Sequence, residues 1–288
     1  MCALDAGDML VGRSHECDHP EWVRQLPACS EPAFDTSVSS GAIDAEVRRR
    51  LASGEELYRI HSDLIRELKP DLVISQSHCE VCAVTPGDLK RSGDCFPTLA
   101  LSASSVEGIF ASIVDVGKRL GLEQRAYAVV GGECQRLENV RRKTAGLPRP
   151  SLVMLEWTDP LFAMGNWGPE IVDFANGDLR IGKKGEYSAA LPAEQLTAAD
   201  PEYLIVAPCG FGLDRALQER AVLERNPWWS ELRAVQAGKV AFADGNLFFN
   251  RSGMTISRTA EIIEEILHGV TFEATAPGQH WRWIGEKA

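Results

Sequence analysis

Cysteine and histidine residues gather in two short segments of the N-terminal half. The first segment is RSHECDHP at residues 13–20, and the second is QSHCEVC at residues 76–82. Zinc prefers thiolate and imidazole ligands, and the spacing of Cys79 and Cys82 allows both sulfurs to reach one ion. With Cys17 as a third ligand, these types and this spacing predict a candidate zinc site. A single pair of this kind is a weak signal.

Two other interpretations of the Cys79 and Cys82 pair remain open. A pair of cysteines at this spacing at the start of a helix can lower a thiol pKa and carry out redox chemistry. Reduced cysteines can also pack beneath a loop as small apolar side chains. Whichever holds, we expect the two segments to contact a ligand through His15, Glu16, Cys17, Gln76 and His78.

Aromatic residues dominate three loops of the C-terminal half, within residues 156–167, 208–213 and 245–253. Such side chains give a large contact area at little cost in conformational entropy, which suits a bulky planar or apolar ligand. The expected ligand contacts are Trp157, Phe162, Trp167 and Phe211, with polar contacts from Asn246, Asn250 and Arg251. The alternative is that about half of these aromatic residues belong to the core, and for Trp167 and Phe248 the two interpretations are even.

Motifs for catalysis are missing from the sequence. We find no GxSxG elbow, no phosphate-binding GxxxxGK[ST] loop, no HExxH pair and no GxGxxG that opens a helix. A protein without these signatures is expected to bind its ligand without transforming it, so we predict no enzyme activity and no required cofactor.

Charge and composition exclude several classes of partner. The 41 acidic residues outnumber the 30 basic residues, and the net charge of −11 disfavours binding to nucleic acid.

No apolar run reaches the roughly 18–20 residues that span a bilayer. The N-terminus shows no signal peptide, so the chain as written indicates a cytoplasmic location, or a periplasmic one if its start is truncated.

Five continuously apolar runs separated by helical periods predict an α/β fold. Runs of this kind are typical of parallel strands that helices cover on both faces. The expected strands are residues 71–75, 98–102, 151–155, 203–207 and 239–243. Ligands of open parallel sheets bind beyond the carboxyl ends of the strands, and the segments named above occupy those positions.

A long apolar period from Leu122 to Val140 predicts one helix between the two groups of strands. A helix of this length spans roughly 35 Å, enough to bridge two domains. The alternative places a strand at residues 125–130 and a turn at Gly131. The helical interpretation gives an N-terminal α/β lobe at 1–121, a connecting helix at 122–146 and a C-terminal α/β lobe at 147–288.

Several ordered motifs resemble the vitamin B12-binding proteins of ABC importers, and more closely a subgroup described as cobalamin-binding. In the first half they are residues 11–20, residues 68–74 (LKPDLVI) and the Cys79–Cys82 pair. In the second half they are residues 152–157, 165–169 (GNWGP), 204–212 and 244–246 (DGN), followed by Asn250 and Arg251. The resemblance covers nearly the whole chain.

The resemblance implies a class III periplasmic solute-binding protein. Such a protein has two lobes, each with a central parallel sheet flanked by helices, joined by one long connecting helix. It binds a corrinoid, a ferric siderophore or haem in the cleft between the lobes and passes it to an ABC transporter permease. Cobalamin or another metal chelate is therefore the expected ligand, and Glu80 is the expected docking residue for the transporter.

The sequence departs from the family pattern at two places. The family opens with a strand and helix, whereas this chain starts at Met1 inside that helix. Gln76 stands where the B12 binder has an aromatic residue. These departures keep a second hypothesis open, in which a cytoplasmic protein on the same fold uses Cys79 and Cys82 to bind metal or for thiol redox chemistry.

Overall fold

The computed structural model describes residues 1–79, 81, 83–91, 96–272 and 278–286. The chain forms two compact units, each assembled from two stretches of sequence. The first unit comprises Met1–Ala103 and Phe110–Val129, and the second comprises Ser104–Ile109 and Val130–Ala288.

The first unit contains two short pairs of strands. Strands β1 (Ser30–Pro32) and β2 (Tyr58–Ile60) pair antiparallel, and strands β3 (Val73–Gln76) and β4 (Thr98–Leu101) pair parallel. Predicted strands at 71–75 and 98–102 are thus confirmed as β3 and β4. The sequence did not reveal β1 and β2, because a three-residue strand is too short to show a pattern.

Helices and turns of the first unit surround these strands. They are η1 (Cys2–Leu4), η2 (Gly7–Met9), η3 (Glu21–Gln25), α1 (Ser40–Ser53), α2 (Ser62–Leu68), α3 (Pro86–Arg91) and most of α4 (Val106–Arg119). Its apolar core joins Leu4, Val116 and Ala126, with Leu99 and Leu101 of β4 packed against them. Gly117 allows the close approach within this core, because a Cβ atom there would lie 2.5 Å from the Ala126 Cβ.

Helix α5 (Glu123–Thr144) is one continuous helix of 22 residues. The helical interpretation of this segment is therefore confirmed, and the strand at 125–130 with a turn at Gly131 is wrong. Gly131 and Gly132 lie inside the helix, where a Cβ would meet nothing within 4 Å. Residues of α5 up to Val129 belong to the first unit and those from Val130 onward to the second. The predicted limits of 1–121, 122–146 and 147–288 stay a prediction.

The second unit is built on a seven-stranded sheet. Six of its strands follow the order β11-β10-β9-β5-β6-β8. The seventh, β7, pairs with β5 and is not part of this order. The strands are β5 (Ser151–Thr158), β6 (Leu161–Ala163), β7 (Asp178–Leu179), β8 (Ala189–Ala190), β9 (Tyr203–Val206), β10 (Val240–Ala243) and β11 (Trp281–Trp283). Strands β5, β9 and β10 are parallel, as predicted, and β6, β8 and β11 are antiparallel additions.

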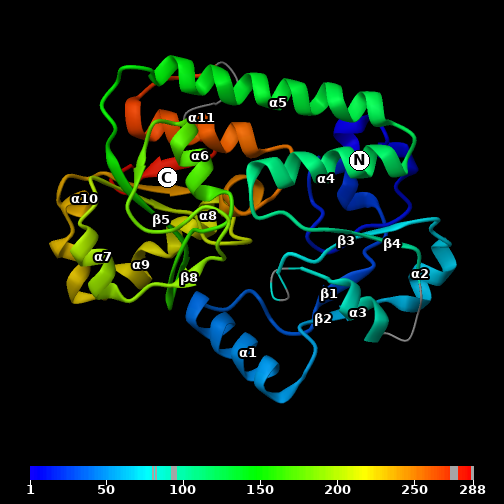
Figure 1. The fold of residues 1–288 in the computed structure, drawn as a ribbon. Coiled ribbons are helices and arrows are strands. Elements are labelled where there is room, and N and C mark those ends of the chain that lie inside the picture. The colour runs from blue at the N-terminus through cyan, green and yellow to red at the C-terminus, as the bar shows by residue number, and fades with distance from the viewer. Residues whose placement is uncertain (80, 82, 92–95, 273–277, 287–288) are drawn as a thin grey trace. The chain divides into compact units, whose positions relative to one another are not determined.

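Helices cover both faces of this sheet, which explains the continuous apolar runs. Figure 1 shows α6 and α11 on one side of it and α7, α9 and α10 on the other. Side chains of β9 and β10 such as Leu204, Val206 and Phe242 are fully buried. The helices are α6 (Gly168–Phe174), α7 (Ala193–Ala199), α8 (Leu213–Gln218), α9 (Arg220–Leu223), η4 (Pro227–Glu231), α10 (Arg233–Gln236), η5 (Gly245–Phe249) and α11 (Ile256–His268).

Together these units confirm the α/β class, with a mostly parallel central sheet flanked by helices. Among the residues that the structure describes, no helix combines the length and apolar content that crossing a bilayer requires.

Glu264 of α11 is an ionisable side chain in the apolar interior of the second unit. It is 0% exposed, and neither carboxylate oxygen has a hydrogen-bond partner among the described residues. Burial raises its pKa from 4.5 to about 7, and the nearby charges of Glu261 and Glu265 add to this effect, whereas Lys143 opposes it. The neutral carboxyl is therefore favoured in the folded state at mildly acidic pH.

We expect Glu264→Met to stabilise the protein at pH 8 by about 1–3 kcal/mol and to have less effect at pH 5. The folded-state pKa of Glu264 lies above its ordinary value of 4.5, so its contribution to stability is lost as pH rises from 4.5 to about 7. Denaturant unfolding at both pH values measures the difference. The control is Glu194→Met at an exposed position of α7. An equal change at both pH values would contradict the assignment.

Candidate functional site

Two aromatic residues meet at the carboxyl edge of the sheet in the second unit. Trp157 lies near the end of β5, and Phe211 lies in the loop after β9. Their ring centroids are 5.2 Å apart at an interplanar angle of 55°. Trp157 is half-buried and its indole Nε1 donates to the Asp159 carbonyl at 3.0 Å. The parallel pairing of β5 and β9 thus brings together two residues that the sequence predicted for the site.

A guanidinium completes this aromatic corner, and sequence reasoning missed it. The Arg215 guanidinium carbon lies 4.0 Å from the centroid of the Phe211 ring. Phe211 itself is only 4% exposed, whereas Trp157 and Arg215 are half-buried. The sequence did contain a signal for this contact, because Arg215 of α8 follows Phe211 by four residues, about one helical turn. A stacked guanidinium gains a cation–π contact and keeps its planar donor edge.

The loops after β9 and β10 are bonded to each other. The Asn246 backbone N–H donates to the Phe211 carbonyl at 3.0 Å. Arg251 donates from Nε to the Asn246 carbonyl and from Nη2 to its Oδ1, at 3.1 and 3.0 Å. The Asn250 amide donates to the Ala207 carbonyl at 2.8 Å. Three predicted polar residues therefore lie together, and Asn250 and Arg251 hold backbone in place.

Gly245 explains how these two loops approach so closely. A Cβ atom at this position would lie 2.1 Å from the Pro208 carbonyl oxygen and 2.6 Å from that of Ala207. No side chain can be placed there without moving backbone, so glycine is required for the contact between the loops.

Asp244 and His280 fix the base of the same region. The Asp244 carboxylate accepts from the Leu247 N–H at 2.8 Å, and the Asp244 N–H donates to the His280 carbonyl at 2.9 Å. Burial raises the pKa of Asp244, although the N–H of Leu247 opposes the shift. Burial lowers the pKa of the His280 imidazole, because it disfavours the charged form of this base. Both residues act as structural supports of the loop.

The other predicted aromatic residues occupy two kinds of environment. Phe162 of β6 pairs in register with Trp157 of β5 and is half-buried beside it. Trp167, at the start of α6, is 5% exposed, which favours the core role left open for it. Phe248 is also 5% exposed and packs edge-on against His280, with centroids 4.7 Å apart.

In the first unit, Tyr58 links the two cysteine-containing segments. His15 Nδ1 lies 2.9 Å from Ser30 Oγ, and the His15 and Tyr58 ring centroids are 5.0 Å apart. The Tyr58 hydroxyl donates to the Val81 carbonyl at 2.5 Å. His15 of the first segment and Val81 of the second thus both contact Tyr58. Sequence reasoning missed Tyr58, which begins the short strand β2.

Gln76 holds the second of these segments. Its Oε1 accepts from the Cys79 N–H at 2.8 Å, and its Nε2 donates to the carbonyls of Cys79 and Ala83, at 2.5 and 2.7 Å. The amide therefore folds the loop that also contains His78. In the first segment, Glu16 Oε1 lies 3.4 Å from His15 Nε2.

The zinc prediction stays a prediction. Cys17 is a free thiol, and Ser14 Oγ lies 3.4 Å from Cys17 Sγ. Cys82 and Glu80 lie outside the described residues. Within the part of the chain that the structure describes, no group of three or more histidine, cysteine or acidic residues is arranged to hold a metal ion.

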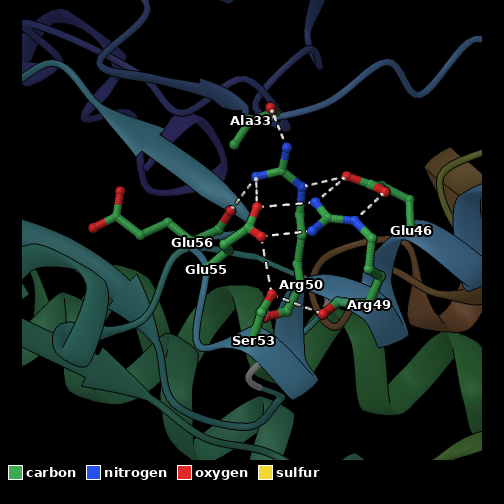
Figure 2. A network of polar contacts seen from close by, with 7 residues as sticks. All are labelled: Ala33, Glu46, Arg49, Arg50, Ser53, Glu55 and Glu56. Atoms are coloured by element: carbon green, nitrogen blue, oxygen red, sulfur yellow. Dashed lines mark hydrogen bonds and ion pairs between the residues drawn. The ribbon is translucent and has the colours of Figure 1, made fainter.

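A network of ion pairs supports the strand pair that carries Ser30 and Tyr58. Figure 2 shows Arg50 of α1 between Glu46 and the backbone carbonyls of Ala33 and Glu56. Its donor–acceptor distances are 2.7 Å to Glu46 Oε1, 3.0 Å to the Glu56 carbonyl and 3.1 Å to the Ala33 carbonyl. Arg50 thus ties α1 to the end of β1 and the approach to β2.

Arg49 adds a second set of ion pairs to this network. Its guanidinium bonds Glu46 and Glu55, and Ser53 Oγ donates to Glu55 at 2.9 Å. The hydrogen bond with Arg49 is the main reason why the pKa of both Glu46 and Glu55 is lowered to about 2. Arg50 adds to the effect on Glu46, and Ser53 adds to that on Glu55. Because these folded-state values lie below 4.5, the contribution of the pairs to stability is present above pH 4.5 and lost as pH falls towards 2.

Arg50→Met is expected to loosen the β1–β2 pair without unfolding the protein. The Ala33 N–H, which donates to the Leu57 carbonyl at 2.9 Å, should exchange with solvent about tenfold faster, since bonds to a charged donor are lost. Hydrogen exchange with mass spectrometry measures this. Arg48→Met is the matched control, because Arg48 is exposed and pairs with Asp44. Equal exchange in the two variants would show that Arg50 does not support the strands.

Comparison with known proteins gives the class of this chain. A family model described as "Periplasmic binding protein" matches residues 3–247. The chain belongs to this family, which confirms the resemblance found in the sequence. A search of curated proteins found no match.

Solved structures of the same fold cover nearly the whole chain. The periplasmic heme-binding protein of Pseudomonas aeruginosa matches with a TM-score of 0.72 and 20% identity, over 100% of this chain and 94% of that one. IsdE of S. aureus, solved with heme, gives 0.70 and 14%, covering 93% of each chain. The vitamin B12-binding protein BtuF of Vibrio cholerae gives 0.63 and 18%, over 92% and 90%. Family and neighbours are solute-binding proteins, not enzymes.

Proposed function

We propose that this chain is the solute-binding component of an ABC importer and that its ligand is a metal chelate with a large flat ring, such as cobalamin. Membership of the periplasmic binding protein family supports the transport role. A transporter permease is then the expected partner. The ligand class rests on the two groups of side chains described above, one in each unit.

The aromatic corner of Trp157, Phe211 and Arg215 is the observation that carries the proposal. The half-buried Trp157 indole and the Arg215 guanidinium both contact the Phe211 ring, and together they offer an apolar aromatic surface and a cation. A metal-bound corrin or porphyrin has a broad apolar face around its metal and polar or acidic groups at its rim. The indole matches the face and the guanidinium matches the rim, where Arg can bind a carboxylate through two hydrogen bonds.

His15 is the proposed ligand for the metal of the chelate. Ser30 Oγ lies 2.9 Å from Nδ1, which supports Nε2 as the coordinating atom. Nε2 is buried, and Glu16 Oε1, 3.4 Å away, has to turn aside for a metal to approach. Tyr58, 5.0 Å from His15 between centroids, is a second potential ligand.

Haem is a second candidate, and the pairing of His15 with Tyr58 favours it. Histidine and tyrosine are both established ligands of haem iron. Three of the structural neighbours are named as heme-binding proteins, a fourth was solved with heme, and one is named as a vitamin B12-binding protein. The first lobe of this chain has Gln76 in place of an aromatic residue, which weakens the case for a corrin.

Titration of the purified protein with hydroxocobalamin and with hemin, followed by absorption spectroscopy, tests the proposal. We expect saturable binding of one of them, with a spectral change that marks coordination by a side chain. Trp157→Leu should weaken binding about tenfold, since stacking on an indole contributes roughly 1 kcal/mol or more. Trp22→Leu, at an exposed tryptophan of the first unit, is the control.

His15→Ala separates coordination from ring binding. The variant should lose the spectral change while part of the affinity remains, and His61→Ala should behave as the unchanged protein. If neither compound binds saturably, the ligand class is wrong. If one binds but Trp157→Leu and His15→Ala leave affinity and spectrum unchanged, the site is wrong.

A further inference from the structure

A cavity of about 430 Å³ lies at the edge strand of the second unit, away from the Trp157–Phe211 corner. Tyr203, the first residue of β9, lines it, whereas the corner lies beyond the opposite, carboxyl ends of the strands. Its wall also includes Trp281 and Trp283 of β11 and the carboxyl end of α11 from Glu265 to Gly269. This volume falls in the range of about 300–1,000 Å³ typical of small-molecule sites.

Strand register places both indoles on one face of the sheet. Ala243 pairs with Trp281 and Ala241 pairs with Trp283, so that each indole lies beside a fully buried alanine. Residues directly opposite in an antiparallel pair share one face, and alternate residues of a strand do so too, so the two tryptophans project to the same side. The opposite face holds Phe242 and is filled by the apolar core.

Three features of the cavity favour a positive charge. The Trp281 and Trp283 rings, with centroids 5.0 Å apart at 87°, present π-surfaces that attract cations. Glu265 adds a carboxylate, 6% exposed, which accepts from Trp281 Nε1 at 3.0 Å. The 13-residue helix α11 ends here, and a helix carries partial negative charge at its carboxyl end.

The Tyr203 ring already has a cation on it. The Lys239 ammonium lies 4.5 Å from the centroid of the Tyr203 ring, and this ring lies 6.3 Å from that of Trp283. Because Lys239 contacts the Tyr203 ring, the tryptophans and Glu265 are the groups of this wall that a second cation would contact. The net charge of −11 raises the local concentration of cations around the whole protein.

We propose that this cavity binds a small organic ammonium ion, with Trp281 and Trp283 around its methyl groups and Glu265 balancing its charge. The ligand differs in chemistry from a flat metal chelate, and the site uses none of the residues assigned to that chelate. Failure of either proposal thus leaves the other standing.

Choline and its neutral isostere 3,3-dimethylbutan-1-ol distinguish a cation site from an apolar cavity. The two molecules have the same shape and differ only in charge. Binding followed by tryptophan fluorescence and ligand NMR should show choline about tenfold tighter, as expected for a partly desolvated cation–π contact. Equal affinities, or no saturable binding of choline at millimolar concentration, would overturn the proposal.

Variants of the cavity locate the binding. Glu265→Gln keeps an oxygen acceptor for Trp281 Nε1 and removes the charge, so choline should bind about tenfold more weakly while the isostere is unaffected. Trp283→Phe should retain more affinity for choline than Trp283→Leu, because it keeps an aromatic face. Trp22→Leu, at an exposed position of the first unit, is the matched tryptophan control. Choline binding that is unchanged in Glu265→Gln and Trp283→Leu would refute the site.

Discussion

The parallel pairing of β5, β9 and β10 is the constraint on which the second unit depends. Their side chains are buried on both faces, so the backbone must satisfy its hydrogen bonds within the sheet and the register has little freedom. One consequence is that the loops after these strands meet at one edge. Trp157, Phe211 and Asn246 come from separate strand ends and are brought together by this pairing.

Several polar side chains in both units are hydrogen-bonded to the backbone of loops, and these bonds stabilise the loops. Gln76 bonds three backbone groups of its own loop, and Asn250 bonds backbone of the loop after β9. Their amides match the donors and acceptors that irregular backbone leaves unpaired. The proposed ligand contacts are therefore mainly rings and a guanidinium: Trp157 and Arg215 of the second unit and His15 of the first. The rings of Trp157 and His15 have few rotatable bonds and lose little entropy on binding.

Much of the fold follows from local patterns, and much of the site does not. Runs such as residues 151–155 and 203–207 predicted β5 and β9, because a buried parallel strand must be apolar throughout. The strand β2 escaped prediction, since three residues show no period, and with it Tyr58 was missed. Arg215 was missed for a different reason: its stacking on Phe211 depends on the start of α8.

The sequence by itself determined the α/β class, the continuous helix α5, the five principal strands and the loops rich in aromatic and cysteine residues. These features depend on residue types that are close in the chain, and the family resemblance rests on the same motifs. Only the tertiary structure decided which side chains meet. It stacked Tyr58 on His15, buried Trp167, and set Trp281 and Trp283 beside two alanines, because such contacts join residues far apart in sequence through strand register and packing.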